Sequence, residues 1–549
     1  MKFIDKCLRE SEISFKPSVD CKCTVAENGM VATAFPDATN AGVKMLECGG
    51  NAVDAACASA LALGVCEPNG SGIGGQSVAI LYINGRTVAI DGSSHAPALA
   101  HSSRFKSDKS RKLGYKATTI PSTLAVLAYL NEKYGRLPWK TVVQPAIEIA
   151  GCGYRITKLQ ERLLNREHKN FLQVSSRSGV RYFFKSDGKP YNAGDLFVQN
   201  DLAKTLAIIA DNGCEEFYRG KIAQQIDADM KKHRGFLRFE DLALIPEVIE
   251  RKPLKSSYRG HAISVFPPPG SGETLLLILA MMEFVPQELF AGNTPEAYGI
   301  LADIFYLAFI EYRQTPRNPN TFPQIVDKIG KRSEIAKRLI AHIDKNRGLR
   351  FSDPEAIAKQ GLGETTHLSV MDGDGNAVGL TQSINLVYGS KAAAEGLGFI
   401  YNNYIEAFQY NKPDHYYNLR PGGIPWPCAV PAIIFKQSKP WIVLGSPGSQ
   451  RIFSSMVQFI SGIIDQHLPI SEAMIKPRIH SEANGELSLE IERFAPDIID
   501  FLATQGLRLK SREPLSFYMG AIQAVLKCQT GNGFQGVADI RRDGTATGF

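Results

Sequence analysis

The segment 365–385, TTHLSVMDGDGNAVGLTQSIN, carries the residues whose types and spacing are most informative for chemistry. Two alternating runs flank a DGDGN cluster, a turn composition, and therefore predict a β-hairpin. If the turn is centred on Asp374, Thr365 lies opposite Ser383 on one face, with Asn385 two residues beyond. Directly opposed residues have Cβ atoms roughly 4.5 to 5.5 Å apart, so these two hydroxyls are close enough to share a hydrogen bond.

The chemistry open to such a pair is nucleophilic attack by a hydroxyl. A threonine hydroxyl is a poor nucleophile at neutral pH and needs a base beside it. Spacing alone leaves two interpretations open: an ordinary hairpin with Thr and Ser on its solvent face, or a positioned hydroxyl pair. A slip of one residue in the register would turn Ser383 away from Thr365.

The elements that must position this hairpin are predicted from the apolar pattern. A helix over 40–65 is followed by the glycine loop NGSGIGG at 69–75, which leads into an alternating strand. The stretch 117–254 has mainly helical periodicity. A polar stretch at 328–360 then gives way abruptly to strands at Thr365, where we place the main boundary of the chain.

Composition excludes several classes of protein. The chain has 549 residues, of which 44% are hydrophobic and 21% charged, and this globular balance excludes a mainly disordered, collagen-like or coiled-coil protein. The net charge of +7 is spread thinly, which gives no support to nucleic-acid binding but allows small acidic substrates. The N-terminus lacks the apolar stretch of a secretory signal, and the most apolar run, 275–282, is too short to span a bilayer. We expect a cytoplasmic protein with no membrane segment.

Three signals of cofactor, metal or nucleophile chemistry are discounted. Ten cysteines are too sparse for a disulfide scaffold, and Cys21 and Cys23 have no second ligand pair nearby for zinc. The glycines at 70–75 fit G-x-G-x-x-G, but a helix precedes them and a strand follows, the reverse of a dinucleotide site. The S-x-x-K match from Ser103 to Lys106 lacks its companion motifs. We expect neither a metal nor a cofactor.

The segment 365–385 also resembles the part of γ-glutamyltransferases that begins with their catalytic threonine. Further motifs resemble that family in the same order: GMVAT (29–33), ECGGNAVDAA (47–56), FYRGKIA (217–223), YRGHAISVFPPPGSG (258–272), GSPGSQRI (445–452) and VADIRRDG (537–544). The resemblance runs from about residue 29 to the end of the chain. It implies an α+β fold, the four-layered αββα sandwich of N-terminal nucleophile hydrolases.

The resemblance implies that Thr365 is the nucleophile and that the chain cuts itself between Glu364 and Thr365. The new α-amine of Thr365, with a reference pKa of roughly 7.7 to 8.0, then accepts the proton of the hydroxyl. A threonine inside the chain has no α-amine and lacks this base. The products would be a large subunit over 29–364, preceded by an extension over 1–28, and a small subunit over 365–549. The two fragments should stay associated as a heterodimer, since the cut falls inside a shared sandwich.

Three further residues receive catalytic roles from the resemblance. Ser383 stands where family members commonly have a threonine that hydrogen-bonds the nucleophile, and it retains the hydroxyl. Gly448 and Ser449 match paired glycines whose backbone N–H groups hold the oxyanion, and a serine still offers its N–H. Loss of one such donor typically costs roughly 10² to 10³ in rate, so this turn should be sensitive to change.

Substrate recognition departs from the family pattern on the carboxylate side. Family members hold the glutamyl α-carboxylate with an arginine, whereas this chain has Ser93 at that position. The paired serines that assist on the same carboxylate align with Pro427 and Cys428.

The α-amine side departs in part. Asn385 is retained, but Tyr404 stands where the family has Gln or Glu, and Ala407 stands where it has aspartate. Glu406 is adjacent and could substitute. Truncating one partner of a buried charged pair commonly costs roughly 2 to 5 kcal/mol, so loss of both anchors should forfeit most selectivity for a γ-glutamyl group.

Three functions follow as alternatives. The first is a self-processing hydrolase or acyltransferase acting on a small amide whose acyl group lacks the α-amino acid pair, with Tyr404 and Trp426 as an apolar wall. The second is a true γ-glutamyl hydrolase or transferase in which Arg420, His95 and Glu406 rebuild the recognition. The third is an unprocessed, non-catalytic binding protein.

Overall fold

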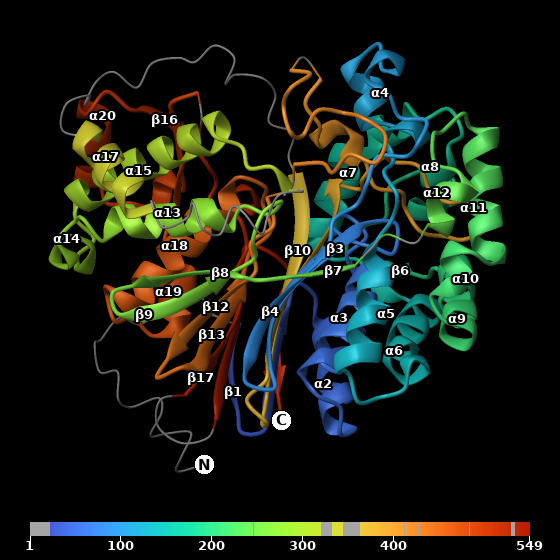
Figure 1. The fold of residues 1–549 in the computed structure, drawn as a ribbon, viewed down its shortest axis with the longest axis horizontal. Helices are drawn as coiled ribbons and strands as arrows, with labels where there is room; N and C mark the ends of the chain where they lie inside the picture. Colours follow the sequence, from blue (N-terminus) through green and yellow to red (C-terminus); the bar gives the residue numbers. More distant parts are fainter. Residues whose placement is uncertain are drawn as a thin grey trace.

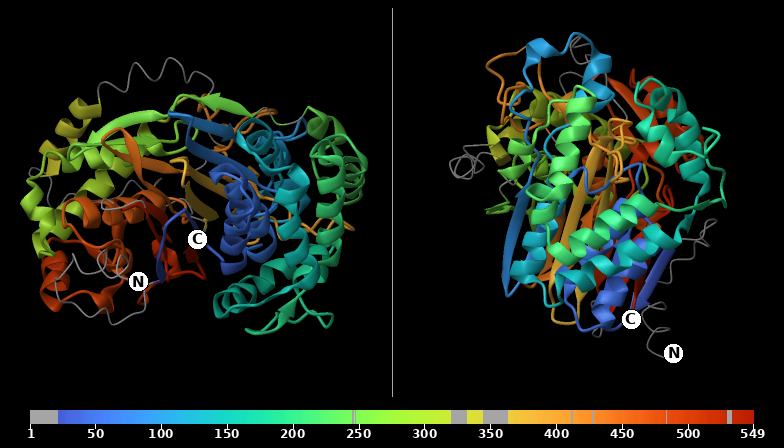
Figure 2. Two further views of the ribbon diagram at one scale, coloured as in Figure 1. Left: turned by 90° about the horizontal axis from the view of Figure 1, so that it is seen from below. Right: turned by 90° about the vertical axis from the view of Figure 1, so that its right-hand side faces the viewer.

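Two seven-stranded sheets lie face to face between two layers of helices (Figure 1). This arrangement confirms the αββα sandwich, and Figure 2 shows the same helical layers from below and from the side. A computed structural model describes residues 22–549 apart from 245, 247, 320–331, 344–362, 411, 427, 483 and 529–532.

The first sheet holds the predicted hairpin at its centre. Its strand order is β19-β2-β10-β11-β3-β4-β7, with every neighbouring pair antiparallel. The strands are β2 (Gly29–Thr33), β3 (Gln76–Ile83), β4 (Arg86–Gly92), β7 (Ile249–Arg251), β10 (Gly363–Asp372), β11 (Ala377–Leu386) and β19 (Thr545–Gly548). Because β10 and β11 run between β2 and β3, the segments on either side of Glu364 are interleaved within one sheet.

The second sheet has the order β1-β18-β17-β13-β12-β9-β8. The strands are β1 (Lys22–Ala26), β8 (Leu254–Tyr258), β9 (His261–Val265), β12 (Ala432–Lys436), β13 (Lys439–Gly445), β17 (Gln523–Lys527) and β18 (Phe534–Ala538). A thin apolar core between the two sheets includes Met30, Ile80, Ile433, Val443 and Val525. These side chains are buried because each strand turns alternate residues toward the facing sheet.

Helices from the first half of the chain cover the first sheet: α2 (Pro36–Glu47), α3 (Ala52–Cys66), α5 (Thr123–Tyr134), α6 (Trp139–Cys152), α7 (Lys158–Leu172), α8 (Ser178–Phe183), α9 (Asn200–Asn212), α10 (Glu215–Tyr218), α11 (Lys221–Lys232) and α12 (Phe239–Ala243). The second sheet is covered by α13 (Gly272–Met282), α14 (Gln287–Ala291), α15 (Pro295–Gln314), α17 (Arg332–Ile343), α18 (Arg451–Ile464), α19 (Ile470–Ile475) and α20 (Pro496–Thr504). Smaller sheets pair β5 (Tyr154–Arg155) with β6 (Leu196–Phe197), and β15 (Glu486–Leu489) with β14 (Ile479–Ser481) and β16 (Arg508–Ser511). None of the described helices is both long and apolar enough to cross a membrane.

The prediction of one helix over 40–65 was wrong, because the chain breaks into α2 and α3. Asn51 caps α3: its side chain accepts the N–H groups of Val53 and Asp54, and the Asp54 carboxylate accepts the N–H of Asn51 at 3.0 Å. This reciprocal capping box satisfies amides that a continuous helix would pair internally. Gly49 and Gly50 stand at the break, and they and the capping Asn51 are local signals of it that the prediction of one helix overlooked.

The predicted N-terminal extension is partly integrated into the fold. β1 lies within residues 1–28 and pairs with β18, so residues 22–26 belong to the second sheet. Residues 1–21, including Cys21, lie outside the described residues, as does most of the polar stretch 328–360.

Candidate active site

The hairpin of β10 and β11 has the predicted register over most of its length, from Thr366 opposite Gln382 to Met371 opposite Ala377. Between Glu364 and Thr366 the register shifts by one residue, so Thr365 stands in a β-bulge. A bulge re-aims a side chain, and bulges are over-represented next to active sites.

The DGDGN turn is tied to the helical layer by one carboxylate. Asp372 accepts the N–H groups of Asp374 and Asn376, each at 3.0 Å, and also the N–H of Ala52 at 2.8 Å. Ala52 is the first residue of α3, where backbone N–H groups lack helical partners. The turn that the sequence predicts therefore also fixes the hairpin against α3.

Ser383 connects the candidate nucleophile to the peptide bond that precedes it. The Thr365 hydroxyl donates to Ser383 Oγ at 3.4 Å, and the Ser383 hydroxyl donates to the carbonyl oxygen of Glu364 at 2.7 Å. The Asn385 N–H donates to Ser383 Oγ at 2.8 Å and holds it in place. A hydroxyl already aimed at a carbonyl oxygen can stabilise negative charge that develops there during attack.

The side chain of Glu364 is buried in an ion cluster that sequence reasoning missed. Its carboxylate contacts the Arg542 guanidinium, and Arg542 also lies 3.7 Å from the carboxylate of Glu67. Burial raises the pKa of Glu67 to about 8; Arg542 opposes the shift and the charge of Glu364 adds to it. Arg542 belongs to the motif at 537–544, which was the only signal for this cluster; Glu67 had none.

Gly448 and Ser449 lie at the start of α18, with positive φ angles of 121° and 55°. The carbonyl oxygens of Gly448 and Ser449 accept hydrogen bonds from the N–H groups of Arg451 and Ile452, each at 3.1 Å. Gly448 and Ser449 therefore lead into the helix N-terminus, where backbone N–H groups have no partner within the helix. Ser449 packs against Gly363, two residues before Thr365. A Cβ atom added to Gly363 would lie only 2.8 Å from the Cβ atom of Ser449. The oxyanion role of both residues stays a prediction.

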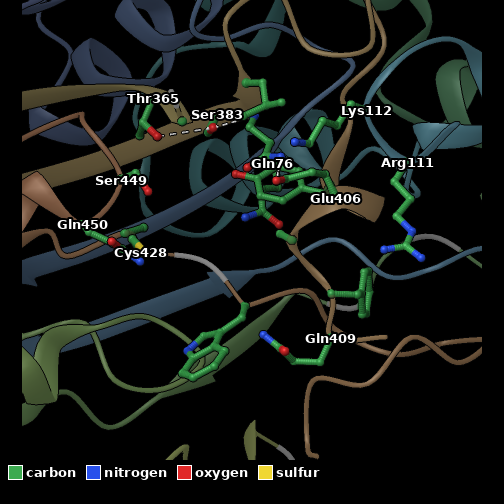
Figure 3. A pocket seen from close by; sticks show the side chains of 18 of the residues that line it. Gln76, Arg111, Lys112, Thr365, Ser383, Glu406, Gln409, Cys428, Ser449 and Gln450 are labelled. Carbon is green, nitrogen blue, oxygen red and sulfur yellow. Dashed lines mark hydrogen bonds between the residues drawn. The ribbon is translucent and has the colours of Figure 1, made fainter. Parts of the chain in front are cut away.

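A cavity of about 500 Å³ opens beside Thr365 (Figure 3). Residues from both halves of the chain line it. Eight of them were named from the sequence as site residues: Thr365, Ser383, Asn385, Tyr404, Glu406, Trp426, Cys428 and Ser449. Gly448 is not among the lining residues, and Pro427 lies outside the described residues.

Ser93 is not brought to the cavity. Its hydroxyl donates to Asp91 at 2.6 Å and its N–H donates to the same oxygen at 2.9 Å, while Asp91 forms a buried ion pair with Arg251 at 2.7 Å. The predicted contact between Ser93 and substrate is therefore not supported. Of the three residues expected to rebuild recognition, Glu406 lines the cavity, whereas Arg420 and His95 do not.

Glu406 lines the cavity next to Asn385, and its role in recognising an amine stays a prediction. It lies in the 3₁₀ turn Tyr404–Ala407, and Asn385 Nδ2 donates to its carboxylate at 3.3 Å. Burial raises the pKa of Glu406, against the positive charge of Lys112. A cation placed next to Glu406 would therefore stabilise the ionised form of its carboxylate.

Neutral hydrogen-bonding groups also line the cavity. Burial raises the pKa of Tyr404 well above its ordinary value, and its hydroxyl interacts with Ser383 and Gln76, so the phenol stays protonated. Burial also raises the pKa of the Cys428 thiol, which bonds with Ser449. Neither group offers a positive charge for a carboxylate.

Aromatic rings close the cavity near Cys428. The Trp426 ring stacks on Tyr417 with centroids 5.0 Å apart and planes 4° apart, and it lies 4.9 Å from the ring of Tyr312. Trp426 was expected as an apolar wall, and it does line the cavity.

Two cations that line the cavity were missed by sequence reasoning. Arg111 and Lys112 come from the short helix α4 (Asp108–Lys112) and lie away from Thr365 in Figure 3. Arg111 packs 3.7 Å from the ring centroid of Tyr410 and pairs with Asp108 at 3.4 Å. Their sequence neighbourhood, DKSRK, reads as a solvated surface turn and gave no sign of a cavity.

The αββα sandwich, with a hydroxyl on an inner strand beside a cavity, is the architecture of the N-terminal nucleophile hydrolases, and the protein is an enzyme of that class. Residues 38–549 match the profile of the family described as Gamma-glutamyltranspeptidase, and the chain belongs to this family. The resemblance inferred from the motifs is thus confirmed.

Relatives in this family carry two kinds of name. A glutathione hydrolase proenzyme of Escherichia coli (strain K12) is 33% identical over 522 residues, covering 91% of this chain and 88% of the relative. An acylase ACY 1 proenzyme of Pseudomonas sp. (strain V22) is 30% identical over 524 residues, covering 91% and 90%. The crystal structure of cephalosporin acylase from Bacillus halodurans has a TM-score of 0.86 at 27% identity, covering 98% of this chain and 99% of that one.

Proposed function

We propose that the chain cuts itself between Glu364 and Thr365 and then hydrolyses small amides, or transfers their acyl groups, through an acyl-enzyme on Thr365. The observation that carries this proposal is the Ser383 hydroxyl, which bridges Thr365 Oγ1 and the Glu364 carbonyl oxygen. Ser383 thus forms a hydrogen bond with the attacking hydroxyl and another with the carbonyl that it would attack. A hairpin with only a structural role would not need both bonds.

The self-cleavage proceeds in two steps. Thr365 Oγ1 attacks the carbonyl carbon of Glu364, and negative charge on its oxygen is stabilised by Ser383. The C–N bond breaks, the hydroxyl proton passes to the nitrogen of Thr365, and an ester links Glu364 to the threonine oxygen. Water hydrolyses the ester, which leaves a carboxylate on Glu364 and a free hydroxyl and α-amine on Thr365.

In the mature enzyme the α-amine of Thr365 accepts the hydroxyl proton as Oγ1 attacks the substrate amide. The leaving amine takes a proton, and the acyl group remains as an ester on Thr365. Water or an acceptor amine then releases it. The amides of Gly448 and Ser449 are proposed to bind the oxyanion of this second reaction. The fragments 1–364 and 365–549 would stay together, because β10 and β11 lie between β2 and β3.

The favoured substrate is an amide whose acyl group lacks the α-carboxylate of a γ-glutamyl group. Tyr404, Cys428 and Trp426 support this, because they offer hydroxyl, thiol and aromatic contacts but no positive charge. The cations Arg111 and Lys112 also line the cavity, but they lie away from Thr365 (Figure 3). The names of the Pseudomonas acylase and of the Bacillus halodurans cephalosporin acylase agree with an acylase-type reaction.

A second candidate is hydrolysis or transfer of a γ-glutamyl group. The hydrogen-bonded pair of Asn385 and Glu406 favours it, because a buried carboxylate beside an amide oxygen suits an α-amine. The 33% identity to the Escherichia coli glutathione hydrolase also supports it.

A panel of chromogenic anilides tests the two candidates. We expect faster turnover of a simple acyl anilide than of the γ-glutamyl anilide, with the acyl group found by mass spectrometry on the 365–549 fragment. Preference for the γ-glutamyl anilide would favour the second candidate. A single band of 60.1 kDa after long incubation, with no turnover, would overturn both and support a binding protein.

A further inference from the structure

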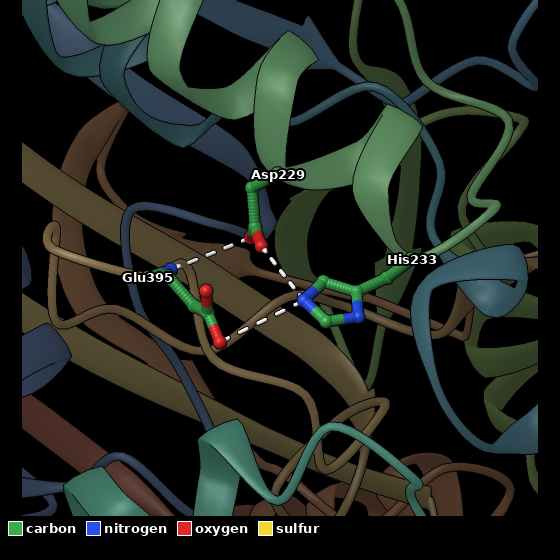
Figure 4. A group of neighbouring side chains, drawn as sticks. All are labelled: Asp229, His233 and Glu395. Carbon is green, nitrogen blue, oxygen red and sulfur yellow. Dashed lines mark hydrogen bonds and ion pairs between the residues drawn. The ribbon is translucent and has the colours of Figure 1, made fainter.

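We propose that Asp229, His233 and Glu395 form a binding site for a divalent transition-metal ion of the Zn²⁺ type. The three side chains gather where helix α11 meets the segment that follows β11, and Figure 4 shows the His233 ring directed at both carboxylates. None of the three lines the cavity beside Thr365, so this site is separate from the proposed acyl chemistry.

The spacing of the ligand atoms fits a metal better than hydrogen bonds. His233 Nε2 lies 3.5 Å from Asp229 Oδ1 and 3.6 Å from Glu395 Oε1, and the ligand atoms all lie within 4.8 Å of one another. Metal bonds of about 2.0 to 2.2 Å in a tetrahedral site place neighbouring ligand atoms about 3.4 Å apart. A hydrogen bond at the observed separations would be long and weak.

Two of the ligand atoms are buried without a hydrogen-bond partner. Asp229 is only 6% exposed, and among the described residues neither its Oδ1 nor His233 Nε2 has such a partner. Leaving a buried polar group unsatisfied costs about 1 to 3 kcal/mol, so native structures rarely do so without a reason. Both atoms point into the space between the three side chains, where an ion would satisfy them.

The ligands are already held in place by their neighbours. Asp229 lies in the last turn of α11 (Lys221–Lys232), and His233, four residues further on, is the C-cap residue of that helix, so the two side chains are neighbours. The other oxygen of Asp229 accepts from the Tyr401 hydroxyl at 2.9 Å, and the His233 ring stacks on Tyr115 with centroids 4.5 Å apart. Such outer contacts orient metal ligands and fix the ring plane.

Two cations compete for Glu395 from the exposed side. Its carboxylate contacts Arg181 and pairs with Lys232 at 2.6 Å, and those side chains are 57% and 63% exposed. Exposed ion pairs contribute little, so an incoming ion can share the carboxylate or displace them. One histidine nitrogen and two carboxylate oxygens leave a fourth position for water and suit Zn²⁺.

The site would connect two parts of the chain. Asp229 and His233 precede the proposed cleavage site, whereas Glu395 follows it, so after cleavage the ion would link the two fragments. This last consequence rests on the proposed function, but metal binding itself does not.

Isothermal titration of the metal-stripped full-length protein with Zn²⁺ tests the proposal. We expect one ion per chain with a micromolar or tighter Kd, weakened at least about 100-fold in His233→Gln and in Glu395→Gln. Arg181→Gln should tighten binding, because it removes a competing cation. His168→Gln is the matched control, since His168 also stacks on an aromatic ring, at 5.1 Å from Phe184, but lies outside the cluster.

Binding should persist in Thr365→Ala, which separates failure of the metal site from failure of the self-cleavage. Co²⁺ bound to the wild-type protein should give the visible absorption of a four-coordinate ion, and His233→Gln should lose it. No Zn²⁺ binding below about 1 mM, or equal binding by wild type and His233→Gln when both are folded by circular dichroism, would overturn the proposal.

Discussion

Replacement of Ser383 by alanine should slow the self-cleavage about 100-fold. The Ser383 hydroxyl lies 2.7 Å from the Glu364 carbonyl oxygen, where negative charge develops as Thr365 attacks. Loss of one such donor typically costs about 2.7 to 4 kcal/mol of transition-state stabilisation, or 10² to 10³ in rate. We expect the lower end, because the bond already exists in the uncut chain and only its strengthening during attack lowers the barrier.

The assay is the conversion of the 60.1 kDa chain into two fragments, followed over time on denaturing gels after cell-free synthesis. Ser383→Thr is the matched control, since it keeps a hydroxyl and should stay within about tenfold of wild type. Chemical denaturation must show that Ser383→Ala loses no more than about 1 to 3 kcal/mol of unfolding free energy, the cost of leaving buried partners unpaired. Cleavage of folded Ser383→Ala within threefold of the wild-type rate would refute the assignment.

Thr365→Ala should abolish both cleavage and amide turnover, whereas Thr365→Ser should keep part of each; turnover by an uncut alanine variant would contradict the mechanism. Arg542→Met removes the cation shared by two buried carboxylates and should lower the unfolding free energy by about 3 to 5 kcal/mol in denaturant titrations; a loss below 1 kcal/mol would count against that cluster. Burial lowers the pKa of His367 to about 3. The unfolded chain therefore binds the extra proton, and stability should fall as the pH drops from about 6.5 to about 3, by up to about 1.4 kcal/mol per pH unit; a His367→Gln variant with the same slope would refute this. Glu406→Gln should raise KM for a γ-glutamyl anilide more than for a simple acyl anilide, and equal effects would exclude Glu406 from amine recognition.

The hairpin was predictable because its determinants are local. Asp and Gly residues in the DGDGN turn favour the register observed from Thr366 to Met371, and this register brings Thr365 near Ser383. The bulge at Thr365 was not predictable, since nothing in the alternating pattern changes there. At this point the Glu364 carboxylate contacts Arg542, which lies 178 residues along the chain and is not part of the local pattern.

The parts of the site that sequence reasoning missed are those made by tertiary contacts. Arg111 and Lys112 read as surface residues, because only the packing of α4 above the 3₁₀ turn makes them part of a cavity wall. The position of Ser93 in a motif predicted that it contacts the substrate. In the structure its hydroxyl instead donates a hydrogen bond to Asp91, two residues earlier. The cytoplasmic location stays a prediction.

The distribution of these residues between strands and loops explains how one family can carry two kinds of name. Thr365 and Ser383 lie on inner strands, where neighbouring strands on both sides fix the geometry needed to attack an amide. Glu406, Lys112 and Trp426 lie on the 3₁₀ turn, a short helix and a loop, which change more readily without loss of the sandwich. Under the proposed function, these loops would set the acyl group that the chain accepts, while the inner strands would keep Thr365 and Ser383 in one arrangement.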